Sequence, residues 1–451
     1  MEAKAKNFKP ITLLVAIGIF ITFLYFPQLE NQTAQRAMAL LVFVAILWIT
    51  EAVPLALTGL IVPLMAVMLH ISEPVAAFSQ YGHPIIFLFM GGFVLAGALS
   101  HHSLDKLLAG KLISLAKGNF YRSAILLMLA TALMACWVTN TAAAAMMIPL
   151  AIGTLTLIKK NCVSAESKFL MLGIAYSANI GGIITMVASP PNAIGAAILN
   201  LSFSDWTIYA LPLFLLTFPI MVFLLTVYFK PDRQVSIVQA LAFDNSIAVN
   251  KTLAAIFILT VTLWVSDSFL SPLFGIKDNF SSLIAVLAIV LIYIFKILSW
   301  DKILQSVQWE ILLLFGGGLT LGMLIESSGL GTLVIGNVTG LITVVPLWLF
   351  LWFVVIFCIL LTEFMSNTAS AALILPMLYS LATLLGINPI ALIFPATIAA
   401  SFGFMMPVGT PPNAMVFGSG LVPRVEMLKA GLLMNLASSV IVAAYFYVIF
   451  S

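Results

Sequence analysis

Charged residues are scarce in this chain: only 8% of its 451 residues are Asp, Glu, Lys or Arg, against about 25% in soluble domains. Hydrophobic residues make up 63%, which excludes a water-soluble globular fold of this size. The formal net charge of +3 is small and the basic residues are scattered, which excludes a nucleic-acid-binding surface. Cys136, Cys162 and Cys358 are too few and too far apart for a disulfide framework or a zinc site.

Long hydrophobic runs dominate the sequence instead. A membrane-spanning helix needs about 20 consecutive apolar residues, and runs of that order recur along the chain. They predict an all-α polytopic membrane protein. The predicted spans are 10–27, 37–50, 53–70, 84–100, 169–201, 207–229, 252–270, 280–298, 309–325, 390–420 and 427–450.

Two further apolar blocks do not fit simple spans. The block between Arg122 and Lys159 is shorter than the roughly 40 residues that two spans need, and both of its ends are basic. It predicts a re-entrant hairpin with its polar tip around Asn140, because polar backbone at membrane depth must line a cavity. By internal symmetry, a second hairpin is predicted at about 350–385, with Asn367 at its tip.

The basic residues support this arrangement of about eleven spans and two hairpins. Of the 19 Lys and Arg residues, all but Arg36 and Lys277 then fall on the same side as the N-terminus. Because Lys and Arg favour cytoplasmic loops, the N-terminus is predicted in the cytoplasm and the C-terminus outside. The expected location is the plasma membrane, which in a bacterium is the inner membrane.

The chain repeats itself at an offset of about 221 to 227 residues. Three pairs of segments match in the same order, namely Phe89–Gly92 with Phe315–Gly318, Asn140–Pro149 with Asn367–Pro376, and Ser189–Asn192 with Thr410–Asn413. The middle pair is identical at six of ten positions. Each copy contains an odd number of predicted spans, so the second should be inverted relative to the first, as in many secondary transporters. The predicted inverted repeats cover about 37–229 and 252–451.

Each repeat supplies a polar hairpin tip and a prolyl break inside an apolar run. The tips are Thr139-Asn140-Thr141 and Ser366-Asn367-Thr368, and the breaks are Ser189-Pro190-Pro191-Asn192 and Thr410-Pro411-Pro412-Asn413. Proline interrupts one helix and suits the first turn of the next, so a half-helix is predicted to start at each break. Its free N–H groups and positive dipole end favour an anion, and unwound carbonyls can coordinate a cation.

Basic residues are absent from the stretches that contain the tips and breaks. No Lys, Arg or His occurs between Arg122 and Lys159, between Lys168 and Lys230, or between Lys302 and Arg424. A buried anion must be compensated and helix ends supply only about half a charge each, so the remaining positive charge is expected to arrive with the substrate. Two repeats suggest at least two co-transported sodium ions. Protons are the rival, with Glu363 as an intramembrane carboxylate.

These motifs resemble the divalent anion/sodium symporter family, which includes the INDY-type dicarboxylate transporters. The duplicated tip, Ser-Asn-Thr in the second copy and Thr-Asn-Thr in the first, followed by the Ser/Thr-Pro-Pro-Asn break carries the resemblance, which covers nearly the whole chain. It implies eleven helices, two opposed hairpins, a homodimer, elevator-like transport and sodium-coupled import of C4 dicarboxylates such as succinate, malate or fumarate. The expected scaffold part is 1–122 and 250–345, and the expected transport part is 123–229 and 346–451.

The resemblance also implies which residues bind the substrate and the ions. The substrate carboxylates would contact Asn140, Thr141, Asn367 and Thr368, beside the half-helix starts at Pro190 and Pro411. One sodium would lie among Thr139, Asn140, Ala188 and Ser189, and the other among Thr362, Ser366, Asn367, Gly409 and Thr410. The family pattern has Ser where this chain has Thr139.

Other functions stay open at this point. An intramembrane hydrolase would need a zinc motif, paired aspartates or a base beside a serine, and the motifs provide none of them, so an enzyme is not expected. A transporter or exchanger of another divalent anion, such as citrate or sulfate, fits the same architecture. So does a proton-coupled carrier.

Overall fold

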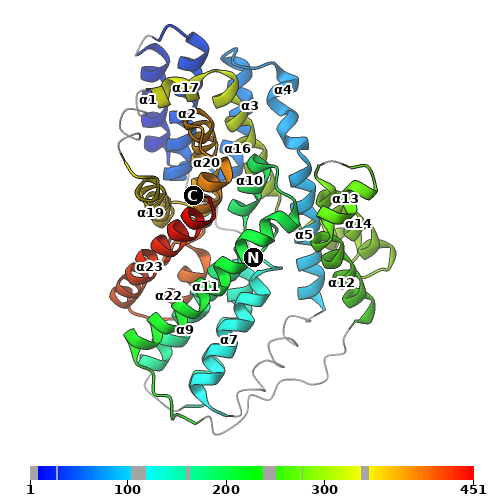
Figure 1. Cartoon of the computed structure of the whole chain (residues 1–451), viewed down its shortest axis with the longest axis vertical. Helices are drawn as coiled ribbons and strands as arrows, with labels where there is room; N and C mark the ends of the chain where they lie inside the picture. The colour runs from blue at the N-terminus through cyan, green and yellow to red at the C-terminus, as the bar shows by residue number, and fades with distance from the viewer. Residues whose placement is uncertain are drawn as a thin grey trace.

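The computed structural model describes residues 9–26, 29–102, 118–158, 163–236, 250–276, 278–336 and 345–450. These residues form helices, with one isolated β-bridge between Asn119 and Ser236, which confirms the all-α fold (Figure 1). The helices of the first half are α1 (Pro10–Tyr25), α2 (Gln32–Thr50), α3 (Leu55–Met68), α4 (Pro74–Ser79), η1 (Gln80–Gly82), α5 (Pro84–His101), α7 (Phe120–Ala135), α8 (Asn140–Thr156), α9 (Ala165–Gly181), α10 (Pro190–Leu199) and α11 (Phe203–Phe229). Those of the second half are α12 (Lys251–Val265), α13 (Asp267–Leu273), α14 (Phe280–Ile294), α15 (Trp300–Ser306), α16 (Trp309–Ser327), α17 (Leu330–Gly336), α19 (Leu347–Phe364), α20 (Asn367–Leu385), α21 (Pro389–Ala399), α22 (Pro411–Gly418) and α23 (Arg424–Phe450).

Every apolar run predicted to span the membrane coincides with a helix or a pair of helices. By length and composition, 7 helices of the described residues could cross a membrane, or up to 8 if one bent pair counts as a span. That pair is α12 and α13, which meet at 79°. The span predicted at 252–270 is therefore formed by two helices, because the chain turns at Ser266 between them.

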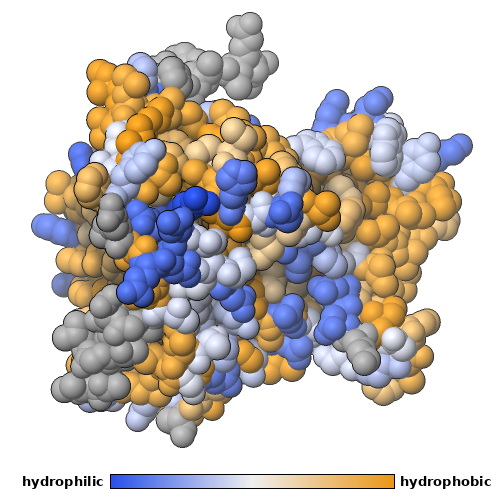
Figure 2. All heavy atoms as spheres, turned by 90° about the horizontal axis from the view of Figure 1, so that it is seen from above, coloured by the Kyte–Doolittle hydropathy of each residue, from blue (hydrophilic) through white to orange (hydrophobic). Residues whose placement is uncertain are grey.

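The outer surface is apolar, as a lipid environment requires. Ile208 and Phe223 on α11 are 65% and 64% exposed, and Val448 on α23 is 75% exposed. Seen along the long axis, hydrophobic residues cover much of the outline while hydrophilic residues gather toward the middle of the view (Figure 2). Cys136 and Cys358 are buried and unpaired, and Cys162 lies outside the described residues.

The glycine-containing segments that match between the repeats are points of close helix contact. A Cβ on Gly91 of α5 would lie 2.6 Å from the Ala285 side chain of α14. A Cβ on Gly317 of α16 would lie 2.5 Å from the Gly59 backbone of α3. A side chain at either position would push two helices apart, so the absence of a Cβ sets the spacing of these pairs.

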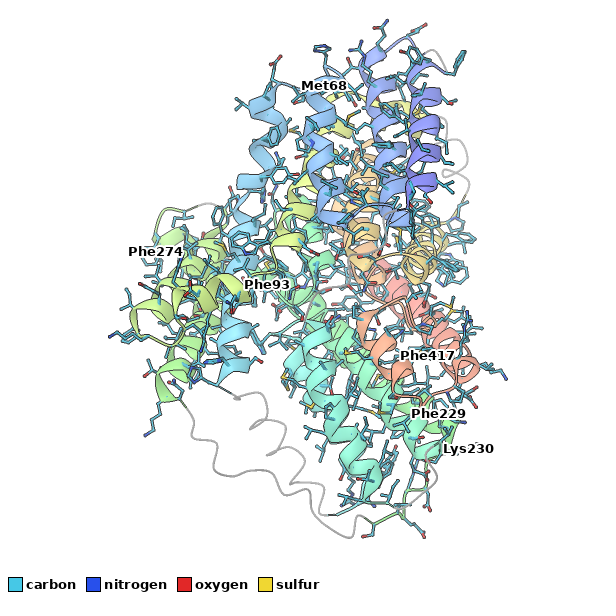
Figure 3. The ribbon with its side chains drawn as sticks, turned by 180° about the vertical axis from the view of Figure 1, so that it is seen from behind. Met68, Phe93, Phe229, Lys230, Phe274 and Phe417 are labelled. Atoms are coloured by element: carbon cyan, nitrogen blue, oxygen red, sulfur yellow. The ribbon has the colours of Figure 1, made fainter. Side chains whose placement is uncertain are left out.

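The molecule is elongated, with α1 to α4 at one end and the outer ends of α7 and α9 at the other (Figure 1). Met68 marks the first end in the opposite view, and Phe229 and Lys230 lie toward the second (Figure 3). Helices α12 to α14 form a group at the side of α5, where Phe274 is 67% exposed.

The two predicted hairpins and the two predicted breaks are present in the chain. Helices α7 and α8 are separated by residues 136–139, and α19 and α20 by residues 365–366. The run that starts at α9 is interrupted at residues 182–189 before α10, and the run that starts at α21 is interrupted at residues 400–410 before α22. Whether the hairpins enter and leave by one face of the membrane stays a prediction.

Candidate functional site

One cavity of about 810 Å³ brings both hairpin tips and both breaks together. Of the residues predicted to bind substrate or sodium, all but Thr362 line it, namely Thr139, Asn140, Thr141, Ala188, Ser189, Pro190, Ser366, Asn367, Thr368, Gly409, Thr410 and Pro411. Thr362 is fully buried behind the lining, where its hydroxyl contacts Asn367. Segments more than 200 residues apart in the sequence therefore form a single polar site.

Four helices begin at residues that line this cavity. Helices α8, α10, α20 and α22 start at Asn140, Pro190, Asn367 and Pro411. Each helix start carries a partial positive charge and unpaired N–H groups, so the four together suit a ligand with negative charge. The sequence predicted the starts at the breaks but not those at the tips, although Thr139 and Ser366 stand where a capping residue is expected.

Thr139 and Thr410 cap their helices directly. The Thr139 hydroxyl accepts the N–H of Ala142 at 3.3 Å, and the Thr410 hydroxyl accepts the N–H of Asn413 at the same distance. Ser189 makes no such side-chain bond at the start of α10. Only the second break is therefore capped by the side chain before its prolines, although the two sequences match.

The asparagine that ends each break motif holds the unwound segment in place. The Asn192 amide donates to the carbonyls of Gly182 and Thr185, both at 2.8 Å. The Asn413 amide donates to the carbonyl of Gly403 at 2.9 Å and to that of Met406 at 3.1 Å. Both asparagines are fully buried. Sequence analysis gave them no role, although their repetition after the paired prolines was the signal.

The tip of the first hairpin presents an oxygen without a hydrogen-bond partner. Asn140 Oδ1 is buried and has none among the described residues, while its Nδ2 lies 3.5 Å from Asn179 Oδ1. A buried acceptor left without a donor costs about 1–3 kcal/mol. A cation at Asn140 Oδ1 would satisfy it, and Thr139, Ala188 and Ser189 lie in the same cavity.

The tip of the second hairpin brings three oxygens together around one proton. Thr362 Oγ1 lies 2.6 Å from Asn367 Oδ1 and 2.8 Å from the Ala400 carbonyl oxygen. A threonine hydroxyl has one hydrogen, so it can donate to only one of these two acceptors. The other oxygen pair repels, and a cation placed among them would remove that repulsion.

The Glu363 carboxylate binds the backbone of the second break. Its carboxylate, 1% exposed, accepts the N–H groups of Met405 at 2.7 Å and Met406 at 2.8 Å. It also accepts the Asn435 amide at 2.7 Å. An ionised carboxylate is an acceptor only, which matches three N–H donors. Its oxygens therefore fix the break rather than face the cavity.

The expectation that no cationic side chain reaches the site is wrong. Lys9 lines the cavity, together with Thr50, Glu51 and Gln308. Lys9 is brought there by packing at the end of α2, where its ammonium donates to the Thr50 carbonyl at 2.7 Å and its N–H to the Ala52 carbonyl at 3.4 Å. The sequence did not reveal this because Lys9 is far along the chain from both tips.

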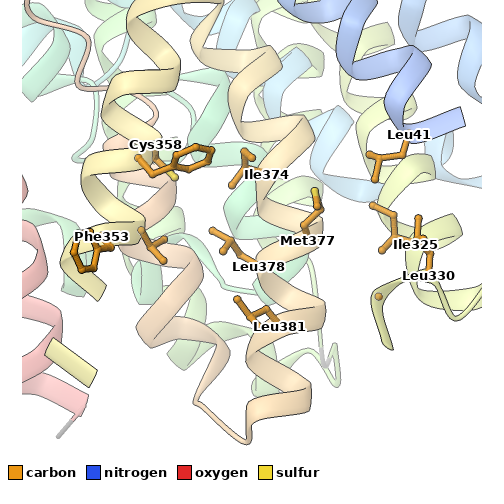
Figure 4. A pocket seen from close by; sticks show the side chains of 12 residues that line it. Leu41, Ile325, Leu330, Phe353, Cys358, Ile374, Met377, Leu378 and Leu381 are labelled. Carbon is orange, nitrogen blue, oxygen red and sulfur yellow. The ribbon is translucent and has the colours of Figure 1, made fainter. Parts of the chain in front are cut away.

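A second cavity, of about 420 Å³, lies between α2, the α16–α17 region and the second hairpin (Figure 4). Its lining is apolar and includes Leu41, Phe353, Ile374 and Met377. A carboxylate placed there would lose its hydration without gaining hydrogen bonds, which excludes this cavity as the anion site.

Comparison with known proteins agrees with the architecture. The family described as "Citrate transporter" (CitMHS) matches residues 45–384. An uncharacterized transporter of Haemophilus influenzae is 42% identical over an alignment of 447 positions that covers 97% of this chain and 96% of that protein. The sodium-dependent dicarboxylate transporter SdcS of Staphylococcus aureus is 32% identical over an alignment of 490 positions that covers 99% of this chain and 93% of SdcS.

A solved structure shares the fold. The crystal structure of the YdaH transporter of Alcanivorax borkumensis matches with a TM-score of 0.56 and 16% sequence identity, over 83% of this chain and 87% of that chain. The family match and the relatives confirm the resemblance drawn from the tip and break motifs. The chain belongs to the citrate transporter family, of the divalent anion/sodium symporter type, and is a multi-pass membrane transporter rather than an enzyme.

Proposed function

We propose that this transporter imports C4 dicarboxylates, such as succinate, malate or fumarate, together with sodium ions. The observation that carries the proposal is the single cavity lined by both tips, both breaks and the starts of four helices. The Staphylococcus aureus relative is named a sodium-dependent dicarboxylate transporter, and it matches over nearly all of its length.

The two substrate carboxylates are assigned to the two tips. Asn140 and Thr141 bind one, and Asn367 and Thr368 bind the other, because amide and hydroxyl groups donate hydrogen bonds to carboxylate oxygens. The α10 and α22 starts, at Pro190 and Pro411, add positive potential from the helix dipoles.

At least two sodium ions neutralise the dianion. The first is assigned to Thr139, Asn140, Ala188 and Ser189, where Asn140 Oδ1 has no hydrogen-bond partner among the described residues. The second is assigned to the oxygens around Asn367, which belong to Thr362, Ser366, Asn367, Gly409 and Thr410. Glu363 is not assigned as a proton carrier, because both of its oxygens accept backbone N–H groups.

Uptake by purified protein in proteoliposomes tests the proposal. Labelled succinate should accumulate when sodium is outside and should fail to accumulate when choline replaces sodium at fixed pH. Malate and fumarate should compete, and sulfate should compete weakly. Uptake that is unchanged in choline but rises with a proton gradient would overturn sodium coupling.

The architecture completes the proposal. The repeats at 37–229 and 252–451 are inverted, and the transport part, 123–229 and 346–451, moves as an elevator against the scaffold, 1–122 and 250–345. The N-terminus is cytoplasmic, the C-terminus is outside, and the scaffold forms a homodimer. A purified protein that stays monomeric in detergent and in lipid nanodiscs would contradict the proposed homodimer.

Citrate is the second candidate substrate, and Lys9 is the observation that favours it. A third carboxylate needs one more compensating positive charge than a dicarboxylate, and Lys9 lines the cavity. The family is also described as citrate transporters. Citrate that inhibits succinate uptake and itself accumulates with sodium would establish it, whereas inhibition without accumulation would make citrate a blocker.

A further inference from the structure

We propose that Asn179 couples the two sodium sites, which rests on the sodium-coupled function proposed above. Asn179 is the link in a chain of hydrogen bonds that runs from the first tip to the second break. It does not line the substrate cavity and makes no contact with the solvent, since it is 0% exposed.

The two ends of the Asn179 amide point to different halves of the molecule. Its Oδ1 lies 3.5 Å from Asn140 Nδ2, at the first tip. Its Nδ2 donates to Thr410 Oγ1 at 3.1 Å, at the second break. Asn179 is near the end of α9, directly before the first break, so one amide joins residues from three separate elements.

The partner at each end has a place in a proposed sodium site. Asn140 Oδ1 is the oxygen without a hydrogen-bond partner that would ligate the first ion. Thr410 caps α22 through the Asn413 N–H and belongs to the second site. An ion that fixes the orientation of the Asn140 amide also fixes Asn179, and through it the start of α22. Binding of the first ion thereby lowers the cost of ordering the second site.

The hydrogen bond from Asn179 to the opposite half has no counterpart at the matching position of the second repeat. Aligning the breaks through Gly182 and Gly403 places Ala400 opposite Asn179, and Ala400 offers no side-chain polar group. The backbone carbonyl of Ala400 instead accepts from Thr362 within the second half. The crossing bond is therefore a departure from the internal symmetry, and a substitution at Asn179 removes it completely.

Sodium titration of the purified full-length protein tests this inference separately from transport. Thermal stability is measured without substrate as sodium replaces choline at constant ionic strength. The wild type should show a Hill coefficient approaching about 2, the number of coupled sites, and Asn179→Leu should lower it toward about 1 while sodium still stabilises the protein. Ser177→Ala is the matched control, because Ser177 is equally buried on α9 but does not join the halves.

Two further variants identify the bond. Asn179→Asp should keep the coupling, because a carboxylate can accept from both the Asn140 amide and the Thr410 hydroxyl. Thr410→Ser should also keep the wild-type Hill coefficient, because serine retains the hydroxyl that accepts from the Asn179 amide. Should Asn179→Leu fail to fold, Asn179→Ala carries the same comparison.

The outcomes separate the two proposals. A wild type that sodium does not stabilise contradicts the proposed function. A wild type that sodium stabilises without cooperativity, or an Asn179→Leu variant with the wild-type Hill coefficient, overturns the coupling role while leaving sodium-dependent transport in place.

Discussion

The two halves of the site have the same backbone plan but different supporting side chains. In the first half, the Thr185 hydroxyl from the break donates to the Cys136 carbonyl before the tip. In the second half, the position of Cys136 is taken by Glu363, whose carboxylate accepts the N–H groups of Met405 and Met406 in the break. Both contacts tie a tip to its own break. One does so with neutral groups and the other with a carboxylate.

This difference shows which parts of a duplicated site are constrained by the ligand and which only by the fold. The lining residues proposed to bind the substrate are the same in both halves, namely Asn140 and Asn367, Thr141 and Thr368, and Pro190 and Pro411. The contacts that join each tip to its break differ between the halves, since any hydrogen-bond donor and acceptor at the right distance can hold the two segments together. Substitutions at matching positions of the two halves therefore test which residues bind the substrate and the sodium ions.

The largest effect is expected where the halves are alike. Asn140→Ala and Asn367→Ala should each abolish uptake, because each amide is proposed to donate to a carboxylate and to offer its oxygen to a cation. Losing one bond to a charged group costs about 1.5–3 kcal/mol, or roughly 10- to 150-fold in affinity. Uptake in proteoliposomes at matched protein content is the measurement.

Controls for this pair lie on the same helices outside the cavity. Thr156→Ala on α8 and Thr383→Ala on α20 remove hydroxyls that bond only within their own helices, so uptake should stay near wild type. Near-normal uptake by Asn140→Ala or Asn367→Ala would remove that residue from the site.

The next effect should differ between the halves. A Cβ at Gly182 would lie 2.1 Å from Asn140 Oδ1, so Gly182→Ala must displace that amide from the first site. At the matching Gly403, the nearest atoms are 3.5 Å away, which is ordinary contact. Gly182→Ala should therefore lose at least about tenfold in sodium affinity, one lost bond to a charged group, while Gly403→Ala stays near wild type. Equal losses in both variants would contradict the placement of Asn140.

Sequence analysis located the helices, the tips and the breaks, because these depend on local properties: the length of an apolar run and the presence of paired prolines. It did not locate the contacts that depend on tertiary packing. The Asn179 bond to Thr410 and the position of Lys9 join segments far apart in the chain. The bend between α12 and α13 also escaped prediction, since the run is apolar on both sides of Ser266.

A smaller effect is expected from the carboxylate that distinguishes the second half. Glu363→Gln replaces one oxygen by an amide NH₂ group that faces a backbone N–H, so at least one bond to the second break is lost. We expect the sodium concentration for half-maximal uptake to rise about tenfold, with the substrate affinity less affected.

Cys136→Ala is the control for Glu363→Gln, because the first half uses the Cys136 carbonyl rather than its side chain. Its sodium dependence should be unchanged. A Glu363→Gln variant with wild-type sodium dependence but a flattened response of uptake to pH would make Glu363 a proton carrier after all.

The smallest effect is expected at Lys9, which neither half of the repeat contains. Lys9 is exposed, so water and salt screen its charge and its removal should change succinate affinity by less than about fivefold. The direction of the change in affinity follows from the lost positive charge. Lys9→Gln should weaken binding of every anionic substrate, and should weaken binding of citrate more than that of succinate because citrate carries the additional carboxylate. Lys9→Arg keeps the charge and should restore the wild-type ratio of citrate affinity to succinate affinity.

The measurement is inhibition of labelled succinate uptake by unlabelled citrate and succinate at low ionic strength, where screening is least. Equal changes for both anions would mean that Lys9 attracts negative charge in general without contacting a third carboxylate, and no change for either would reduce it to a group that binds the end of α2.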